Sequence, residues 1–148
     1  MDEYIIRETD DFYPLSILFK ENGIGVEIST AAPEKIVKMW RMDDPVTGEL
    51  MASSTLEIRD DVYTLGNIAV REDLHGKGYG KIMQDIVLDH ARSLGVSEVW
   101  ACAKEPDFYK NLGWEALDWD TAPAIDTHCV ACGKRGTICN PEKMRYTL

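Results

Sequence analysis

The feature that most constrains the fold is an unbroken stretch of sequence that predicts a strand, a glycine-rich loop, an amphipathic helix and a second strand. The first strand is DVYTLGNIAV (61–70), and the loop contains HGKGYG (75–80). The helix follows over KIMQDIVLDHARSLG (81–95), where apolar residues recur at helical spacing and the final glycine is a typical C-terminal stop. VSEVWACA (96–103) is the second strand. Because a helix connects them, the two strands are expected to form a parallel pair.

The remaining segments predict an antiparallel meander and further helices around this unit. Strand patterns alternate with turn-rich sequences such as DDPVTGE (43–49). The predicted elements are strand YIIRET (4–9), helix DFYPLSILFKENGI (11–24), strands KIVKMWRM (35–42) and ELMASSTLEIR (49–59), a short helix around PDFYKNLG (106–113), strand WEALDW (114–119) and a last strand near MRYTL (144–148). At 148 residues the chain fits one domain, residues 1–148, of the mixed α/β (α+β) class.

The glycine loop lies where a strand runs into a helix, and this position suits an anion. The first N–H groups of a helix lack partners within the helix, and the positive end of the helix dipole lies behind them. Gly76, Gly78 and Gly80 lack the Cβ atoms that would hold a pyrophosphate away, and Lys77 either adds a charge or is solvated. The spacing matches neither G-x-G-x-x-G nor the Walker pattern, so a tight turn with close helix packing is the alternative interpretation.

The run from residue 67 to about 117 resembles the core of the GCN5-related N-acetyltransferase (GNAT) superfamily, whose members transfer acyl groups from acyl-coenzyme A to amines. The loop pattern of that family, [QR]-x-x-G-x-[GA], falls on His75, Gly78 and Gly80, with His75 replacing the usual Gln or Arg. The resemblance implies a central mixed, mostly antiparallel sheet with two splayed parallel strands, flanked by helices. It also implies acetyl-coenzyme A (acetyl-CoA) as the cosubstrate.

In the same family the loop amides bind the pyrophosphate, and the end of the preceding strand pairs through its backbone with the pantetheine arm. By resemblance, the residues that contact the cosubstrate in this chain are Ile68, Ala69, Val70, His75, Gly76, Lys77, Gly78, Tyr79, Gly80 and Lys81.

The resemblance also assigns a general acid. FYKNLGW (108–114) places Tyr109 where many relatives have a tyrosine beside the sulfur, and a phenol with a pKa near 10 can protonate a departing thiolate. The alternative is that Phe108 and Tyr109 are simple core residues. Glu57 is the candidate general base, although many relatives use a chain of waters. Cys102 stands where relatives often have asparagine, and a small buried side chain is its ordinary role.

A second candidate site lies near the C-terminus, in a cysteine-rich loop at about residues 126–140. HCVACGKRGTIC supplies Cys129, Cys132 and Cys139, and His128 would complete four ligands for a structural zinc ion. A reversible disulfide and free thiols are the alternatives. A metal there would shape the loop and take no part in the transfer reaction.

Charge limits the partners. The formal net charge is −10, with 26 acidic and 16 basic residues, which argues against nucleic acid and anionic membranes and favours a cationic acceptor. No signal peptide or membrane span is recognised, so we expect a cytoplasmic protein, and a homodimer is common in the superfamily. The expected function is transfer of an acetyl group to a primary amine of a small molecule or peptide by direct attack in a ternary complex. The alternatives are a non-catalytic acyl-CoA-binding or sensing module and a small metal-stabilised interaction domain.

Overall fold

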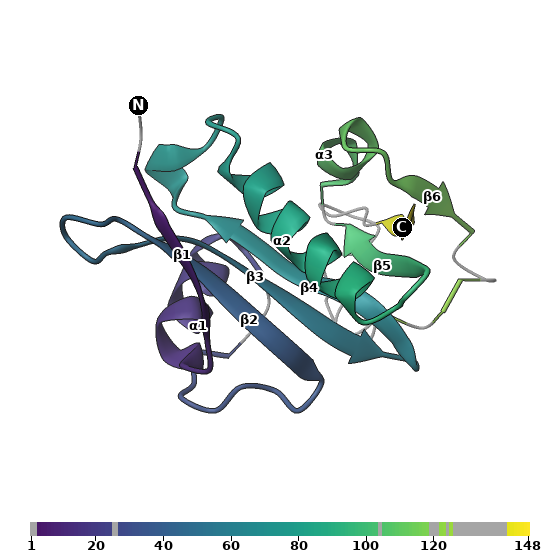
Figure 1. Cartoon of the computed structure of the whole chain (residues 1–148), viewed down its shortest axis with the longest axis horizontal. Helices are drawn as coiled ribbons and strands as arrows, with labels where there is room; N and C mark the ends of the chain where they lie inside the picture. Colours follow the sequence, from purple (N-terminus) through teal and green to yellow (C-terminus); the bar gives the residue numbers. More distant parts are fainter. Residues whose placement is uncertain (1–2, 25–26, 104, 119–121, 124, 126–141) are drawn as a thin grey trace.

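The computed structural model describes residues 3–24, 27–103, 105–118, 122–123, 125 and 142–148. These residues form a seven-stranded sheet in the order β1-β2-β3-β4-β5-β7-β6 (Figure 1). The strands are β1 (Ile5–Thr9), β2 (Ile36–Asp43), β3 (Leu50–Arg59), β4 (Val62–Val70), β5 (Glu98–Ala103), β6 (Glu115–Leu117) and β7 (Glu142–Thr147). The helices are α1 (Phe12–Glu21), α2 (Tyr79–Ser93), α3 (Pro106–Asn111) and the short 3-10 helix η1 (Glu72–Leu74).

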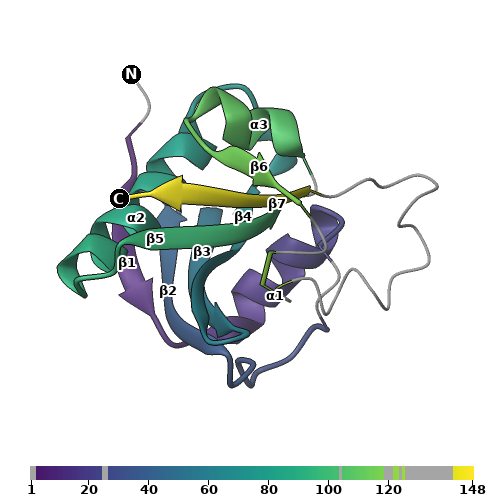
Figure 2. The same ribbon diagram turned by 90° about the vertical axis from the view of Figure 1, so that its right-hand side faces the viewer.

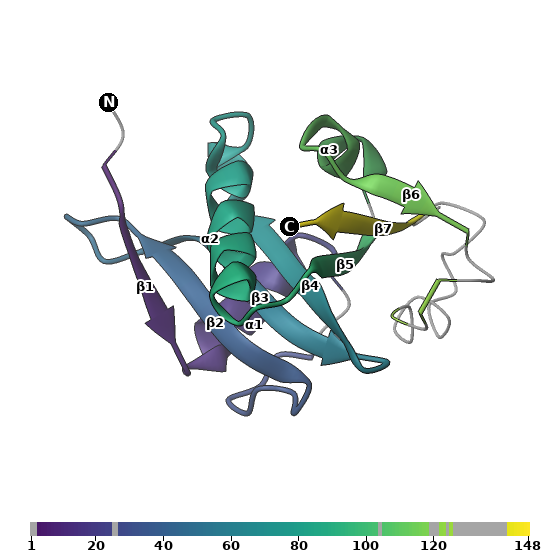
Figure 3. The ribbon, with the colours of Figure 1, turned by 45° about the vertical axis from the view of Figure 1, so that its right-hand side comes forward.

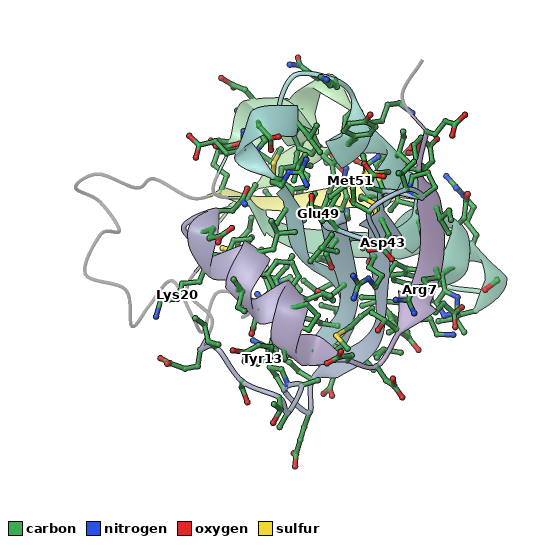
Figure 4. The ribbon with its side chains drawn as sticks, turned by 90° about the vertical axis from the view of Figure 1, so that its left-hand side faces the viewer. Arg7, Tyr13, Lys20, Asp43, Glu49 and Met51 are labelled. Atoms are coloured by element: carbon green, nitrogen blue, oxygen red, sulfur yellow. The ribbon has the colours of Figure 1, made fainter. Side chains whose placement is uncertain are left out.

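The helices cover the two faces of this sheet. Figures 1 and 3 show α2 lying across one face with α1 behind the sheet, and Figure 4 views the molecule from the α1 side. On the α2 face, Met83 and Val87 pack against sheet residues such as Leu56 in one buried apolar cluster. On the α1 face, Phe12, Leu15, Leu18 and Phe19 form a second cluster with Met39 and Ala69. The apolar spacing of both helices therefore predicted their buried sides correctly.

The predicted antiparallel meander is confirmed in strands β1 to β4. Asp60 and Asp61 connect β3 to β4 and have positive φ values of 49° and 61°. A two-residue hairpin needs such left-handed residues, and aspartate tolerates them better than most side chains do. Two predicted bounds were too long: α1 ends at Glu21 because Gly23 turns the chain at φ 75°, and β6 has only three residues.

Strands β4 and β5 are parallel, as predicted, and their register joins them at one pair, Thr64 and Trp100. Beyond that pair β5 continues against β7, which Figure 2 shows lying between β5 and β6, whereas β4 continues to pair with β3 as far as Val70. Within the described ranges, the β5-facing edge of β4 after Thr64 therefore has no strand beside it. The predicted splay of the two parallel strands is confirmed.

A bulge in β4 lies where the two strands separate. Thr55 pairs with Asn67 and Leu56 pairs with Leu65, so Gly66 is an extra residue in β4. A Cβ atom at Gly66 would collide with the carboxylate of Glu57, which lies over it. A residue without a side chain is required here because a buried charged group occupies the space.

None of the helices in the described ranges is both long and apolar enough to cross a membrane.

Candidate active site

The glycine loop joins the end of β4 to the start of α2. Gly76 and Gly78 have φ values of 82° and 85°, which only glycine adopts without strain, and no described atom outside their chain neighbours lies within 4 Å of a Cβ built on either. Gly78 is the N-cap of α2, and Ile82 N donates the first helical hydrogen bond to its carbonyl, at 3.3 Å. The amides of Gly80 and Lys81 are therefore donors that the helix itself does not use.

Gly80 serves a different purpose from the other two glycines. It lies inside α2, so its backbone does not require glycine. A Cβ at this position would lie 3.2 Å from Cε1 and Cζ of Phe108 and 4.0 Å from a methyl carbon of Val70. The absence of a side chain lets α3 approach the first turn of α2. Three parts of the predicted site, the end of β4, the start of α2 and α3, consequently meet at Gly80.

The open edge of β4 presents main-chain groups from alternate residues. Arg71 N donates to Met51 O at 2.8 Å, and Val70 lies opposite Ala52. In the alternating pattern of an antiparallel pair, the N–H and C=O groups of Val70 and Ile68 then point away from β3, and those of Ala69 point toward it. The side chain of Ala69 is buried on the α1 face. Of the three strand residues predicted to contact the cosubstrate, Ile68 and Val70 have the main-chain orientation for it.

His75, which departs from the family pattern, has a partner in this structure. Its ring Nε2 lies 2.7 Å from Val70 O, a distance at which an N–H on Nε2 donates to the carbonyl. The bond folds the start of the loop back onto the end of β4. The carbonyl of Val70 therefore already has a hydrogen-bond partner in His75. The N–H of Val70 and the main-chain groups of Ile68 still face the open edge of β4.

Tyr109 lies in α3, half-buried between two aromatic rings. Its ring meets Phe108 edge to face at a centroid distance of 5.1 Å and Trp114 at 5.3 Å. Burial raises the pKa of the Tyr109 hydroxyl far above its ordinary value, with smaller contributions from Glu105 and Cys102. The hydroxyl therefore keeps its proton at neutral pH, which a general acid requires.

Glu57 is fully buried and surrounded by donors. Oε1 accepts from Arg59 Nε at 2.9 Å and lies 3.7 Å from Lys35 Nζ. Oε2 accepts from Thr55 Oγ1 at 2.9 Å and from Asn67 Nδ2 at 3.2 Å. To take a proton from an amine, the carboxylate would have to give up one of these bonds. The assignment of Glu57 as general base stays a prediction.

An open depression of about 530 Å³ lies between the end of α1 and the segment that follows β4. Its lining residues are Glu21, Asn22, Arg71, Glu72 and Asp73. Arg71 donates to Asp73 at 2.7 Å and lies 3.5 Å from Glu49, which is labelled in Figure 4. Carboxylates outnumber guanidinium groups here, so the depression is acidic.

The candidate zinc ligands His128, Cys129, Cys132 and Cys139 lie outside the described residues, and their role stays a prediction. Among the described residues, no group of three or more His, Cys, Asp or Glu side chains could hold a metal ion. Cys102 is partly exposed on β5.

Three residues near the site were not recognised from the sequence: Gly66, Gln84 and Trp114. A glycine within a strand pattern was a usable signal for Gly66, because it often marks a bulge. Trp114 donates from Nε1 to Gln84 Oε1 at 2.7 Å, and no local pattern predicts this contact across 30 residues.

Comparisons with known proteins give a family and a fold. The model of the acetyltransferase (GNAT) family matches residues 5–114. The sequence matches none of the curated proteins.

Among solved structures, the N-acetylglutamate synthase from Neisseria gonorrhoeae complexed with coenzyme A and N-acetyl-glutamate has a TM-score of 0.75 at 19% identity over 100% of this chain. The match spans 36% of that synthase. Rv2747 from Mycobacterium tuberculosis in complex with CoA has a TM-score of 0.69 at 16% identity, covering 97% of this chain and 99% of that one. The IAA acetyltransferase from Bacillus cereus has a TM-score of 0.66 at 19% identity, covering 99% and 100%. At these identities the likenesses show the fold.

Proposed function

Because this chain belongs to the GNAT family of acetyltransferases, whose model matches residues 5–114, we propose that it transfers the acetyl group of acetyl-CoA directly to a primary amine in a ternary complex. The observation that carries the proposal is the meeting of the bare first turn of α2, the open edge of β4 and α3 around Gly80. Acetyl-CoA needs three things from such a site: an anion-binding loop for its diphosphate, an open strand edge for its pantetheine arm, and a proton donor for its departing thiolate.

In this proposal the diphosphate of acetyl-CoA binds at the loop. The amides of Gly80 and Lys81 are donors without helical partners, and the dipole of α2 favours negative charge at the same place. The pantetheine arm adds to the edge of β4 through the N–H of Val70 and the main chain of Ile68. Because these groups belong to the main chain, binding depends less on which side chains the loop carries than on the lack of side chains that would block access to its backbone.

The chemical step follows from this placement. The amine nitrogen attacks the carbonyl carbon of the thioester, the new C–N bond forms, and the C–S bond breaks. The departing thiolate takes the proton of the Tyr109 hydroxyl, which solvent then restores, and the proton lost by the amine passes to water. Holding both reactants in one geometry contributes about 7–11 kcal/mol in well-oriented cases. Positioning therefore supplies most of the rate, and Tyr109 supplies the remainder.

The acceptor is a primary amine that carries an additional positive charge. Two features support this choice: the acidic depression beside the loop and the net charge of −10. The Neisseria synthase holds N-acetyl-glutamate, an anionic product. Both charge types therefore belong in a substrate screen.

Thiol release from acetyl-CoA, followed over a panel of diamines, basic peptides and amino acids, tests the proposal. We expect turnover with at least one amine, a preference for cationic acceptors, and a KM that rises with ionic strength as the charges are screened. Binding of CoA in calorimetry with no turnover over the whole panel would favour the sensing module instead.

Gly78→Ala is expected to weaken CoA binding by about 5–30-fold. At φ 85° a Cβ atom costs about 1–2 kcal/mol, which biases the loop away from the conformation that exposes its amides. The matched control is Gly48→Ala, in the turn between β2 and β3, where φ is 74° and the space around a Cβ is equally open. Calorimetry with CoA should show the loss for Gly78→Ala only. Equal affinities for both variants would contradict the loop as the diphosphate site.

A further inference from the structure

We propose that Phe108, Trp114 and Gln84 are positioning residues, which fix the Tyr109 hydroxyl relative to the first two turns of α2. The diphosphate site on α2 and the general acid on α3 are then held in a fixed relative position. This inference rests on the proposed function, in which α2 seats the diphosphate and Tyr109 protonates the thiolate.

The helix that carries Tyr109 cannot hold its own position. α3 has six residues, and none of these described residues is buried. Its N-cap, Glu105, makes no side-chain capping bond within the described residues. Isolated helices of this length are not stable in water, so α3 owes its conformation and place to tertiary contacts.

The first contact is that of Phe108 with Gly80. The ring lies so close to the Gly80 backbone that an added Cβ would be 3.2 Å from two ring carbons. Real side chains rarely accept such a distance, so the ring would have to move by a few tenths of an ångström. The family pattern quoted above accepts either glycine or alanine at this position. In this chain the neighbouring phenylalanine, more than the cosubstrate, accounts for the glycine.

The second contact lies one helical turn further along α2. Gln84 is 2% exposed and Trp114 is 4% exposed, and Trp114 Nε1 donates to Gln84 Oε1 at 2.7 Å. A buried polar pair of this kind is costly to break, because either partner alone would be left unsatisfied. The main chain continues the connection, since Trp114 N donates to Tyr109 O at 3.1 Å.

These two contacts enclose the catalytic ring. Gly80 and Gln84 are four residues apart and lie on the same side of α2. Gly80 contacts Phe108, and Gln84 contacts Trp114. The rings of Phe108 and Trp114 both pack edge to face on the ring of Tyr109, with interplanar angles of 89° and 82°. Tyr109 is therefore held between two rings that are each anchored to the helix of the diphosphate seat. A shift of either anchor moves the hydroxyl relative to the thioester.

The test is a double-mutant cycle in the full chain, comprising the parent, Gly80→Ala, Phe108→Leu and the double variant. Gly80→Ala is expected to lower kcat about tenfold and to change the KM for acetyl-CoA by less than about threefold, because misplacement of an acid by a fraction of an ångström acts on the chemical step. In the Phe108→Leu background, where the ring is gone, the same alanine should cost less than about twofold in kcat. If Gly80→Ala costs the same in both backgrounds, or acts mainly on KM, the inference is overturned.

Gln84→Met tests the second anchor, since it keeps the length of the side chain and removes the acceptor. We expect kcat to fall with little change in KM for acetyl-CoA. Trp114→Phe removes the donor of the same bond, so in the Gln84→Met background it should lower kcat by less than about a further twofold. Fully independent losses of kcat in the double variant would contradict the assignment. Thermal unfolding of all variants without cosubstrate records the packing contact independently of turnover.

The experiments distinguish a failure of the proposed function from a failure of the positioning inference. If the parent protein turns over no acceptor, the proposed function fails and positioning fails with it. If the parent is active and the kcat effects do not couple, only the inference fails.

Discussion

Replacing Tyr109 by phenylalanine is expected to lower kcat by about 10²–10³-fold while the KM for acetyl-CoA stays within about threefold. The substitution removes the proton donor and keeps the ring between Phe108 and Trp114, so the packing of α3 is preserved. The measurement is steady-state thiol release with the best acceptor of the panel. Tyr13→Phe, on the exposed surface of α1 (Figure 4), is the matched control and should leave both constants unchanged.

The pH dependence of the parent protein follows from the direction in which the pKa of Tyr109 is shifted. Burial raises the pKa of Tyr109 above that of the same residue in the unfolded chain, which is about 10. The buried neutral phenol is therefore fully stabilising below pH 10, and its contribution is lost only as the pH rises above that value. Tyr109 should create no alkaline fall in kcat between pH 6 and about 10.

If the Tyr109→Phe variant has the same kcat as the parent protein, water protonates the thiolate and Tyr109 is not the general acid.

Glu57→Gln is expected to lower the free energy of unfolding by about 3–5 kcal/mol, because it removes the negative charge from a buried ion pair and leaves the Arg59 guanidinium without its carboxylate. Of the groups that donate to the carboxylate, only the Thr55 hydroxyl can turn round to accept from the new amide NH₂, and Arg59 and Asn67 present N–H donors. Urea denaturation measures the loss. The control Glu8→Gln removes an exposed pair with Lys38 and should cost less than about 1 kcal/mol.

The same variant distinguishes an anchor from a base. If Glu57 holds the bulge at Gly66, the folded variant retains kcat within about tenfold and loses stability. If it is the general base, kcat falls by about 10²–10⁴-fold at a temperature where the variant is still folded. A stability close to that of the parent would contradict the anchoring role.

Much of the fold was accessible from the sequence because its signals are local. The apolar spacing of α1 and α2, the Asp60–Asp61 turn and the strand, helix, strand order of the parallel pair were predicted and confirmed. The glycine loop was also located correctly, since Gly76 and Gly78 have the left-handed conformations that such a loop needs. Helix ends were less accurate: α2 starts at Tyr79, two residues before the predicted start.

The candidate site was predicted only in part. Sequence reasoning treated the three glycines together, either as a pyrophosphate site or as a tight turn with close helix packing, and it did not single out Gly80, which makes room for Phe108. It placed His75 among the residues that contact the cosubstrate, whereas in the structure the His75 ring lies 2.7 Å from Val70 O. It proposed Glu57 as a base without indicating the donors that enclose it or the missing side chain of Gly66 beneath it.

By itself the sequence determined the helices and strands, their order and the place of the glycine loop. Hydrophobic periodicity, turn residues and the preference for glycine at positive φ are all signals that extend over only a few residues. Only the tertiary structure decided which glycine serves the backbone and which serves a neighbour, which strand residues face the open edge, and how α3 is held to α2. Those properties depend on contacts such as Gly80 with Phe108 and Gln84 with Trp114, whose partners lie 28 and 30 residues apart and meet only when the helices pack.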